Sequence, residues 1–256
     1  MDEYVFKHCQ AISDLLNQGS EDLARDELIK LLDYMSRHEQ PYNPLINALI
    51  REVGLYPYME EGSSSWTDAF ACNLFKVDVG LAEEKALHRE QYKLLKALLD
   101  NKNIAVSAPT SFGKSFVVDA FIKLKKPQNV MIIVPTIALT DETRRRIYKK
   151  FSHEYNIITT TDADLAERNI FIFPQERAIH YVDKLKSLDI LIIDEFYKSS
   201  KIFEKDRAAN LIKAIIELGH KAKQRYYLAP NISRIEDNLA KTEHSHPLGM
   251  VVSTHF

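Results

Sequence analysis

The chain has 256 residues, of which 45% are hydrophobic and 27% charged, and its formal net charge is −2. This composition is typical of a soluble globular protein and excludes disordered, fibrous and low-complexity classes. No apolar run approaches the roughly 18 residues of a membrane span, and the first ten residues lack a secretory signal pattern. We therefore expect no membrane partner and a cytoplasmic location. The two cysteines have no metal-ligand or redox spacing, so we expect free thiols.

The first part of the chain is acidic and predicts helices. Residues 1–80 contain 6 Lys and Arg against 14 Asp and Glu, whereas the rest contains 28 against 22, which suits a polyanionic partner for the later part. Apolar residues recur at helical spacing in residues 11–18 and 22–35, with Ser20 as a candidate N-cap. A further apolar helix, residues 47–56, follows the turn-rich residues 40–44. We expect a loop at residues 60–66. Residues 1–80 thus predict a small helical domain with a structural or partner-docking role.

From about residue 85 the pattern changes to short apolar runs separated by amphipathic stretches. Because the runs are continuously apolar, they predict parallel strands covered on both faces. The stretches at residues 115–125 and 140–151 have the length and periodicity of crossover helices. We expect an α/β fold with a doubly wound parallel sheet over residues 81–256, whose ligands bind beyond the carboxyl ends of the strands. The six predicted strands are residues 103–109, 129–136, 156–161, 169–174, 189–195 and 225–230.

Residues 108–115, with the sequence APTSFGKS, lie where a predicted strand gives way to a predicted helix. This context is that of a P-loop, whose backbone N–H groups hold phosphate oxygens. We expect Lys114 to reach the β and γ phosphates of ATP and the Ser115 hydroxyl to bind Mg²⁺. Ala108 replaces the usual first glycine, and the alternative is a chance match at a strand-to-helix turn. The expected nucleotide-binding residues are Pro109, Thr110, Ser111, Phe112, Gly113, Lys114 and Ser115.

A second motif supports the first. The predicted strand 189–195 ends in Asp194 and Glu195, so their carboxylates lie at the sheet edge that also carries the phosphate loop. Asp194 is suited to hold Mg²⁺, and Glu195 to orient and deprotonate the attacking water. The alternative is that this acidic pair only caps a helix. Together with Lys114, the two carboxylates form the predicted catalytic set of an NTPase.

With these motifs, residues 87 to about 232 resemble the DEAD/DEAH-box helicases of superfamily 2, whose ATP-binding domain is RecA-like. The resemblance implies that Gln91, seventeen residues before Ala108, reads the adenine edge; the alternative is a solvated helix residue. Pro135 and Thr136 resemble motif Ia, which lines the nucleic-acid backbone. Further positions resemble the TPxR-type motif, through Arg177, and motif III, which couples the ATP site to strand movement through Ala229 and Asn231.

The resemblance implies sequence-independent, salt-sensitive binding of DNA or RNA through phosphates. The basic residues 144–146 with Lys149 and Lys150 could add to that surface, although such a cluster is more often a solvated helix face. Three departures are visible: motif II reads DEFY, Ile137 follows Thr136 where a cation is common, and the first P-loop position is Ala108. The DEFYK and LAPN variants, together with residues 47–59, are similar to bacterial helicases of anti-phage defence systems such as Hachiman.

The family closes its ATP site between two RecA-like domains. Only 25 residues follow Asn231, too few for a second such domain, so we expect a fragment that needs the missing domain or a partner protein. A missing transition-state arginine costs about 10³ to 10⁵ in rate in related enzymes, which predicts weak hydrolysis by the chain alone. The expected function is the motor half of an ATP-dependent DNA or RNA helicase or translocase. The alternatives are a nucleotide-dependent switch that docks a partner protein and, less favoured, a P-loop ATPase of another class.

Overall fold

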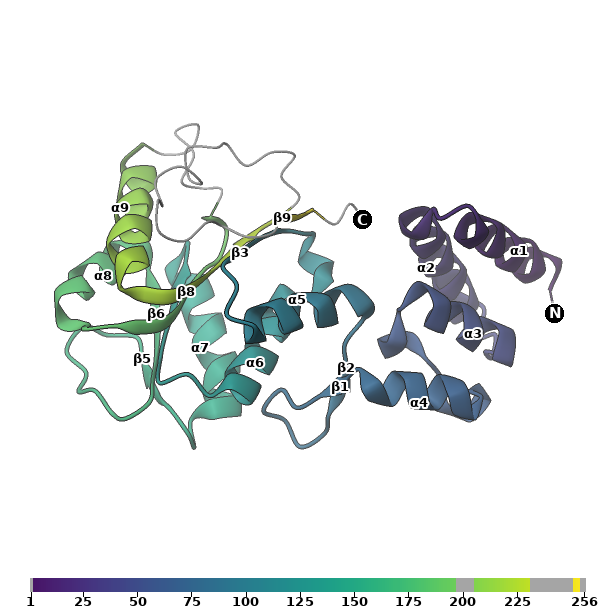
Figure 1. Ribbon diagram of the computed structural model, residues 1–256, viewed down its shortest axis with the longest axis horizontal. Coiled ribbons are helices and arrows are strands. Elements are labelled where there is room, and N and C mark those ends of the chain that lie inside the picture. Colours follow the sequence, from purple (N-terminus) through teal and green to yellow (C-terminus); the bar gives the residue numbers. More distant parts are fainter. Residues whose placement is uncertain (1, 197–204, 231–250, 254–256) are drawn as a thin grey trace. The chain divides into compact units, whose positions relative to one another are not determined.

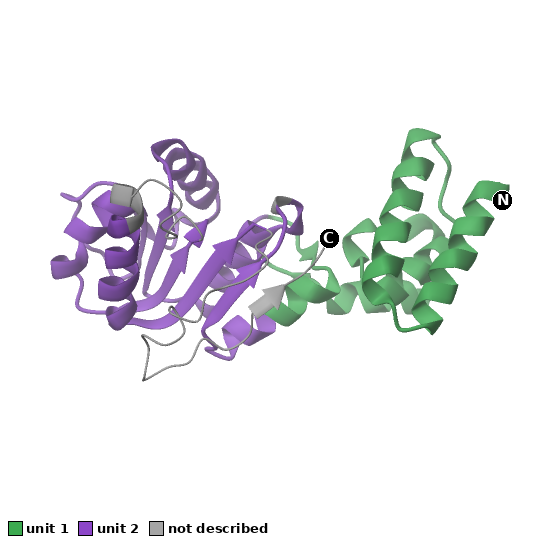
Figure 2. Cartoon of the chain, turned by 90° about the horizontal axis from the view of Figure 1, so that it is seen from above, with its two compact units in different colours: residues 1–78, 82–94, 256 green, residues 79–81, 95–255 purple. Residues whose placement is uncertain are grey.

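The computed structural model describes residues 2–196, 205–230 and 251–253. The chain divides into two compact units, which Figure 2 distinguishes by colour. The first contains residues 1–78 and 82–94, and the second contains residues 79–81 and 95–255. No helix in the described ranges combines the length and hydropathy needed to cross a membrane.

The first unit is helical (Figure 1). Its apolar residues recur at helical spacing and meet in one core, which lies between the first three helices. The helices predicted over residues 11–18, 22–35 and 47–56 are confirmed, and each forms part of a longer or shifted helix. The elements are α1 Glu3–Asn17, α2 Glu21–Arg37, α3 Pro44–Val53, η1 Tyr56–Tyr58, η2 Glu61–Ser63, α4 Trp66–Leu74, the antiparallel ribbon of β1 Lys76–Val77 and β2 Lys85–Ala86, and the start of α5 Arg89–Leu99.

The ends of these helices follow from local chemistry. The Asn43 side chain accepts hydrogen bonds from the backbone N–H groups of Leu45 and Ile46 and caps α3, with Pro44 as its first residue. Gly54, at φ +82°, ends α3 in the left-handed conformation that glycine adopts without a steric penalty. Ser20 is the N-cap of α2, as predicted, but its side chain makes no capping hydrogen bond.

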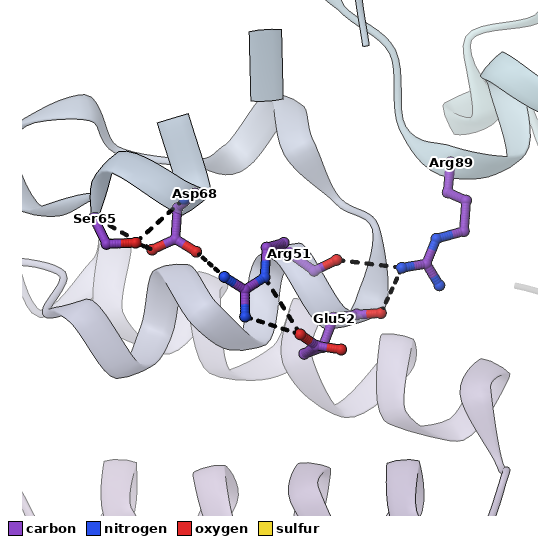
Figure 3. A network of polar contacts seen from close by, with 5 residues as sticks. All are labelled: Arg51, Glu52, Ser65, Asp68 and Arg89. Atoms are coloured by element: carbon purple, nitrogen blue, oxygen red, sulfur yellow. Dashed lines mark hydrogen bonds and ion pairs between the residues drawn. The ribbon is translucent and has the colours of Figure 1, made fainter. Parts of the chain in front are cut away.

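The loop expected at residues 60–66 is wrong in part. Residues 61–63 form a 3₁₀ turn, and α4 begins at Trp66. A capping box starts this helix, because the Ser65 hydroxyl accepts from the Asp68 N–H while the Asp68 carboxylate accepts from the Ser65 N–H (Figure 3). Trp66, Phe70 and Leu74 recur four residues apart and are a signal for this helix in the sequence, although all three side chains are exposed.

A polar network ties the beginning of α5 to the end of α3 within the first unit (Figure 3). The Arg89 guanidinium donates to the carbonyls of Glu52 at 2.7 Å and Arg51 at 3.3 Å. The Arg89 N–H donates to the Gly54 carbonyl at 2.9 Å. The Arg51 side chain in turn pairs with the buried Asp68 at 2.9 Å. Two helix ends and the N-cap of α4 are therefore held in one connected set of contacts.

The second unit is built on a seven-stranded sheet in the order β5-β6-β4-β7-β8-β3-β9, in which every neighbouring pair is parallel. The doubly wound α/β fold and all six predicted strands are confirmed. β9 was not predicted, because it has only three residues, of which two are apolar, and so short a run does not indicate a strand. The strands are β3 Ile104–Ser107, β4 Asn129–Val134, β5 Asn156–Ile158, β6 Asn169–Pro174, β7 Leu188–Ile193, β8 Ala222–Ala229 and β9 Val251–Ser253.

Helices cover both faces of this sheet, α8 and α9 on one side and α6 and α7 on the other (Figure 1). Alternate residues of the central strands pack against α8 and α9 in a core that includes Phe171, Phe173 and Tyr227. The strand residues between them face α6 and α7. The helices are α6 Lys114–Lys125, α7 Ile137–Phe151, α8 Gln175–His180 and α9 Lys205–Lys221.

Candidate nucleotide site

The phosphate loop follows the buried strand β3. Residues 110–112 form a 3₁₀ turn, and Gly113, at φ +73°, opens α6 in the left-handed conformation. A residue with a side chain would be strained at this φ, so the glycine of the motif is required by the backbone. The loop therefore ends at a helix N-terminus, whose N–H groups favour anions. The Phe112 side chain is buried and its N–H donates to the Pro109 carbonyl at 3.1 Å, whereas Ser111 and Ser115 are exposed.

Lys114 is folded over its own loop. Its ammonium donates to the carbonyls of Ala108 at 2.5 Å and Pro109 at 2.9 Å. Burial lowers the pKa of Lys114, while Asp194 and Glu195 act in the opposite direction by stabilising its charge. The charges of Asp194 and Glu195 therefore act on the ammonium of Lys114, the third residue of the predicted catalytic set.

The two carboxylates follow β7 directly. The Asp194 N–H donates to the Ile133 carbonyl at 2.9 Å, which extends the ladder between β7 and β4 by one bond. Burial raises the pKa of Asp194, and the charge of Glu195 raises it further, whereas Lys114 lowers it. Glu195 has φ +54°, a conformation that is uncommon for residues other than glycine and that clusters at functional sites. The structure brings Lys114, Asp194 and Glu195 together, and their catalytic roles stay predictions.

The motif III position is bonded to the phosphate loop through the main chain. β8 lies between β3 and β7 in the sheet, and the Ala229 carbonyl accepts from the Ala108 N–H at 3.1 Å. The Ser107 hydroxyl donates to the Pro230 carbonyl at 3.4 Å. A shift of the end of β8 would therefore move or break the hydrogen bond to Ala108, the first residue of the loop. Asn231, the second coupling residue predicted from the sequence, lies outside the described residues.

Gln91 belongs to the first unit and caps its own helix. Its side-chain oxygen accepts from the His88 N–H at 3.0 Å, and its N–H donates to the His88 ring nitrogen Nδ1 at 3.2 Å. This reciprocal pair has the form of a capping box at the start of α5. Gln91 is 7% exposed, which contradicts the alternative of a solvated helix residue. Its role as the reader of adenine stays a prediction.

The predicted nucleic-acid residues lie at the carboxyl ends of the neighbouring strands β4 and β6. Thr136 is the N-cap of α7, and its hydroxyl accepts from the Leu139 N–H at 3.2 Å, directly after the buried Pro135. Arg177, in α8, donates to the Thr159 carbonyl at 2.6 Å. Both polar groups are therefore engaged with the chain itself, at the edge of the sheet where the phosphate loop also lies.

The basic run on α7 is divided between two acidic partners. Arg144 and Arg145 pair with Asp141 on the same helix, both at 2.9 Å. Arg146 and Lys150 instead pair with Asp119, which is 1% exposed in the middle of α6. The run therefore serves in part to join α7 to the helix of the phosphate loop. This structural role was missed, although an acidic residue inside the apolar run VVDAF was a signal for it.

The donor set of the site fits magnesium in the form that ATPases use. In the described ranges no group of three or more His, Cys, Asp or Glu could hold a metal by itself. Mg²⁺ in such enzymes is held by one or two protein oxygens, completed by phosphate oxygens and water. A hydroxyl at Ser115 and a carboxylate at Asp194, whose pKa is raised first by burial and then by the adjacent Glu195, would suit a site of this kind. A divalent cation would relieve the repulsion between the two carboxylates.

A cavity of about 540 Å³ lies elsewhere, at the amino ends of β5 and β6. It is lined by residues 152–156 and 166–168, among them Glu154 and Arg168. Because ligands of doubly wound sheets bind at the carboxyl ends of the strands, this cavity is not the phosphate site.

Comparison with known families identifies the type of domain. The family model described as DEAD/DEAH box helicase matches residues 88–229. The chain belongs to this family. The resemblance seen in the motifs is thereby confirmed, and the DEAD/DEAH box domain is an ATPase-type motor domain. A second model, the Anti-bacteriophage protein B N-terminal domain, matches residues 1–69, in agreement with the resemblance to anti-phage helicases.

Two individual proteins are similar to this DEAD/DEAH box chain. Anti-bacteriophage protein B of Escherichia coli (strain K12) is 30% identical over 263 residues, which cover 98% of this chain and 35% of that protein. The chain therefore spans about a third of the length of this relative. The Sulfolobus solfataricus SWI2/SNF2 ATPase core in complex with dsDNA is 17% identical, with a TM-score of 0.45 over 56% of this chain and 31% of that chain.

Proposed function

We propose that this chain is the ATP-binding and ATP-hydrolysing motor half of a helicase or translocase that acts on DNA or RNA. The observation that carries this proposal is that β3 and β7 flank β8 in parallel, so that the phosphate loop with Lys114 and the carboxylates of Asp194 and Glu195 follow strands at the same edge of the sheet. A cation, a P-loop and two adjacent carboxylates at one place are what phosphoryl transfer to water needs. Membership in the DEAD/DEAH box helicase family supports the choice of nucleic acid as the track.

Each residue has a defined task in this proposal. Lys114 exchanges its two loop carbonyls for oxygens of the β and γ phosphates, and the N–H groups of the loop and of α6 hold the remaining oxygens. Ser115 and Asp194 hold Mg²⁺, which when bound neutralises charge on the phosphates. Glu195 accepts a proton from the water that attacks the γ phosphate. Gln91 recognises the adenine.

The nucleic-acid track is proposed to follow Pro135, Thr136 and Arg177. Backbone N–H groups at the starts of α7 and α8, together with the Arg177 guanidinium, suit phosphates rather than bases. Binding is therefore independent of sequence and weakens as salt is added, because each phosphate contact releases counterions.

The similarity to Anti-bacteriophage protein B suggests the setting. We propose that the chain acts in defence against bacteriophage. In this proposal the helical unit corresponds to the N-terminal domain of that relative. Because the chain spans 35% of the relative, full activity is assigned to a longer protein or to an assembly that supplies a second motor domain.

The first experiment is a titration of the chain with a fluorescent ADP and Mg²⁺. Lys114→Ala should weaken binding at least 100-fold, because charge-assisted bonds to phosphate are lost. Lys213→Ala, which removes an exposed lysine paired with Glu217 on α9, is the matched control and should bind as the wild type does. Failure of the wild type to bind, or equal binding by Lys114→Ala, would contradict the proposal.

The second experiment measures ATPase activity of the full-length protein with and without nucleic acid. Activity should rise with DNA or RNA and be lost on Glu195→Gln, while nucleotide binding by that variant persists. Equal activity with and without nucleic acid would refute a motor and favour a nucleotide-dependent switch, in which partner affinity responds to ATP even after Glu195→Gln.

A further inference from the structure

β8 carries two consecutive tyrosines that are both fully buried. Tyr226 is 0% exposed and Tyr227 is 1% exposed. Since successive side chains of a strand point to opposite faces, the two rings lie in different layers of the domain. Tyr227 packs with Phe196 at a ring-centroid distance of 5.9 Å, in the core beneath α8 and α9. Tyr226 therefore faces the layer of α6, the helix that begins with the phosphate loop.

The strand register places Tyr226 on the strand next to Asp194, one pair of residues farther from the carboxyl edge of the sheet. Tyr226 lies opposite Ile192 of β7 and opposite Ile104 of β3. Asp194 follows Ile192 by two residues, so its side chain emerges on the same face, one step closer to the carboxyl edge of the sheet. Diagonal neighbours of this kind are within reach of an aromatic side chain. The Tyr226 ring thus lies between the magnesium carboxylate and the strand that leads into the phosphate loop.

The Tyr226 hydroxyl is the unusual group in this layer. It is buried and has no hydrogen-bond partner in the part of the chain that the structure describes. Buried hydroxyls are nearly always bonded, and a native exception calls for an explanation such as a functional role. A tyrosine hydroxyl can donate one hydrogen bond, so the Tyr226 hydroxyl has a donor to offer.

We propose that Tyr226 positions Asp194 for magnesium, by donating its hydroxyl hydrogen bond to the inner oxygen of the carboxylate when the outer oxygen faces the cation. This rests on the proposed function, which gives Asp194 as a residue that holds Mg²⁺. Tyr226 touches neither nucleotide nor cation and acts through Asp194. Partners of this type orient carboxylate ligands, and their removal typically costs 10- to 100-fold in metal affinity.

The neighbouring tyrosines provide matched variants. Tyr226→Phe and Tyr227→Phe each remove one buried hydroxyl from adjacent positions of β8, on opposite faces. The readout is binding of a fluorescent ADP by the 256-residue chain, measured with Mg²⁺ and again with EDTA. We expect Tyr226→Phe to weaken binding about 10-fold with Mg²⁺ and to leave binding with EDTA unchanged. Tyr227→Phe should leave both affinities unchanged.

A second measurement uses the chain without nucleotide. Because the Tyr226 hydroxyl has no hydrogen-bond partner among the described residues, Tyr226→Phe should not lower the unfolding temperature. Wild-type affinity of Tyr226→Phe in Mg²⁺ would overturn the inference and leave the proposed function intact. Equal losses with Mg²⁺ and with EDTA would also overturn it, since they indicate a general packing defect. A wild type that binds nucleotide equally well with and without Mg²⁺ would overturn the magnesium assignment itself.

Discussion

Two glycines of the helical unit allow steric crowding to be separated from backbone strain. Gly19 and Gly54 both follow helices and have similar conformations, at φ +73° and φ +82°. A Cβ added at Gly19 would meet no heavy atom within 4 Å, whereas at Gly54 it would lie 2.6 Å from the Cβ and 2.8 Å from the Nε of Arg89. Gly54→Ala should therefore destabilise the unit more than Gly19→Ala.

The expected magnitudes follow from these contacts. Left-handed alanine costs about 1–2 kcal/mol, which is the whole penalty for Gly19→Ala. Gly54→Ala adds the cost of overpacking, about 1–3 kcal/mol, because the Cβ of Arg89 is part of α5 and cannot move without its helix. The total for Gly54→Ala is about 2–5 kcal/mol.

The assay is urea unfolding followed by far-UV circular dichroism, with hydrogen exchange of peptides from α3 and α5 to locate the effect. A double variant, Gly54→Ala with Arg89→Gly, has none of the Arg89 side-chain atoms that crowd a Cβ at position 54, and should lose less free energy than the sum of the single losses. If the two glycine variants lose the same free energy, or if the double variant is additive, the contact with Arg89 does not limit this position.

Three further changes test other contacts. Asp119→Ala leaves two cations of α7 without their buried partner and should cost about 3–5 kcal/mol in urea unfolding; Asp141→Ala, which frees two exposed arginines of the same helix, should change stability little. The pKa of Glu154 is lowered to about 2, chiefly by the hydrogen bond from Lys123, so its contribution to stability is present above about pH 4.5 and lost as pH falls toward 2. Glu154→Gln should therefore lower the unfolding temperature at pH 7, and the difference from the wild type should shrink between pH 5 and pH 3; a constant difference would refute the ion-pair origin. Ser65→Ala removes the capping box of α4 and should cost about 1 kcal/mol, with faster hydrogen exchange in α4 alone.

The strands of the sheet could be predicted closely because the chemistry that buries them is local. β4 and β6 are continuous apolar runs that end at the turn chemistry of the next helix, and their observed bounds lie within the predicted ones. Gly113 likewise marked the loop, since the left-handed start of α6 requires that residue. These predictions were confirmed because the conformation of each segment depends on its own residues.

Long-range partners could not be predicted in the same way. The partner of Arg146 is Asp119, 27 residues earlier on another helix, and no spacing rule connects them. The relation between Tyr226 and Asp194 depends on the register of β7 against β8, which only the folded sheet defines. α4 was missed although Trp66, Phe70 and Leu74 recur at helical spacing in the sequence. These side chains are exposed in the structure and do not belong to a hydrophobic core.

The insertion of β8 between β3 and β7 has a consequence for how this domain can vary. The lysine and the acidic pair are carried by strands that do not touch, so their separation is set by the width of the intervening strand and by the side chains that it places on each face. Substitutions along β8 can therefore change the distance between the phosphate loop and the acidic pair without changing any residue proposed to contact the nucleotide.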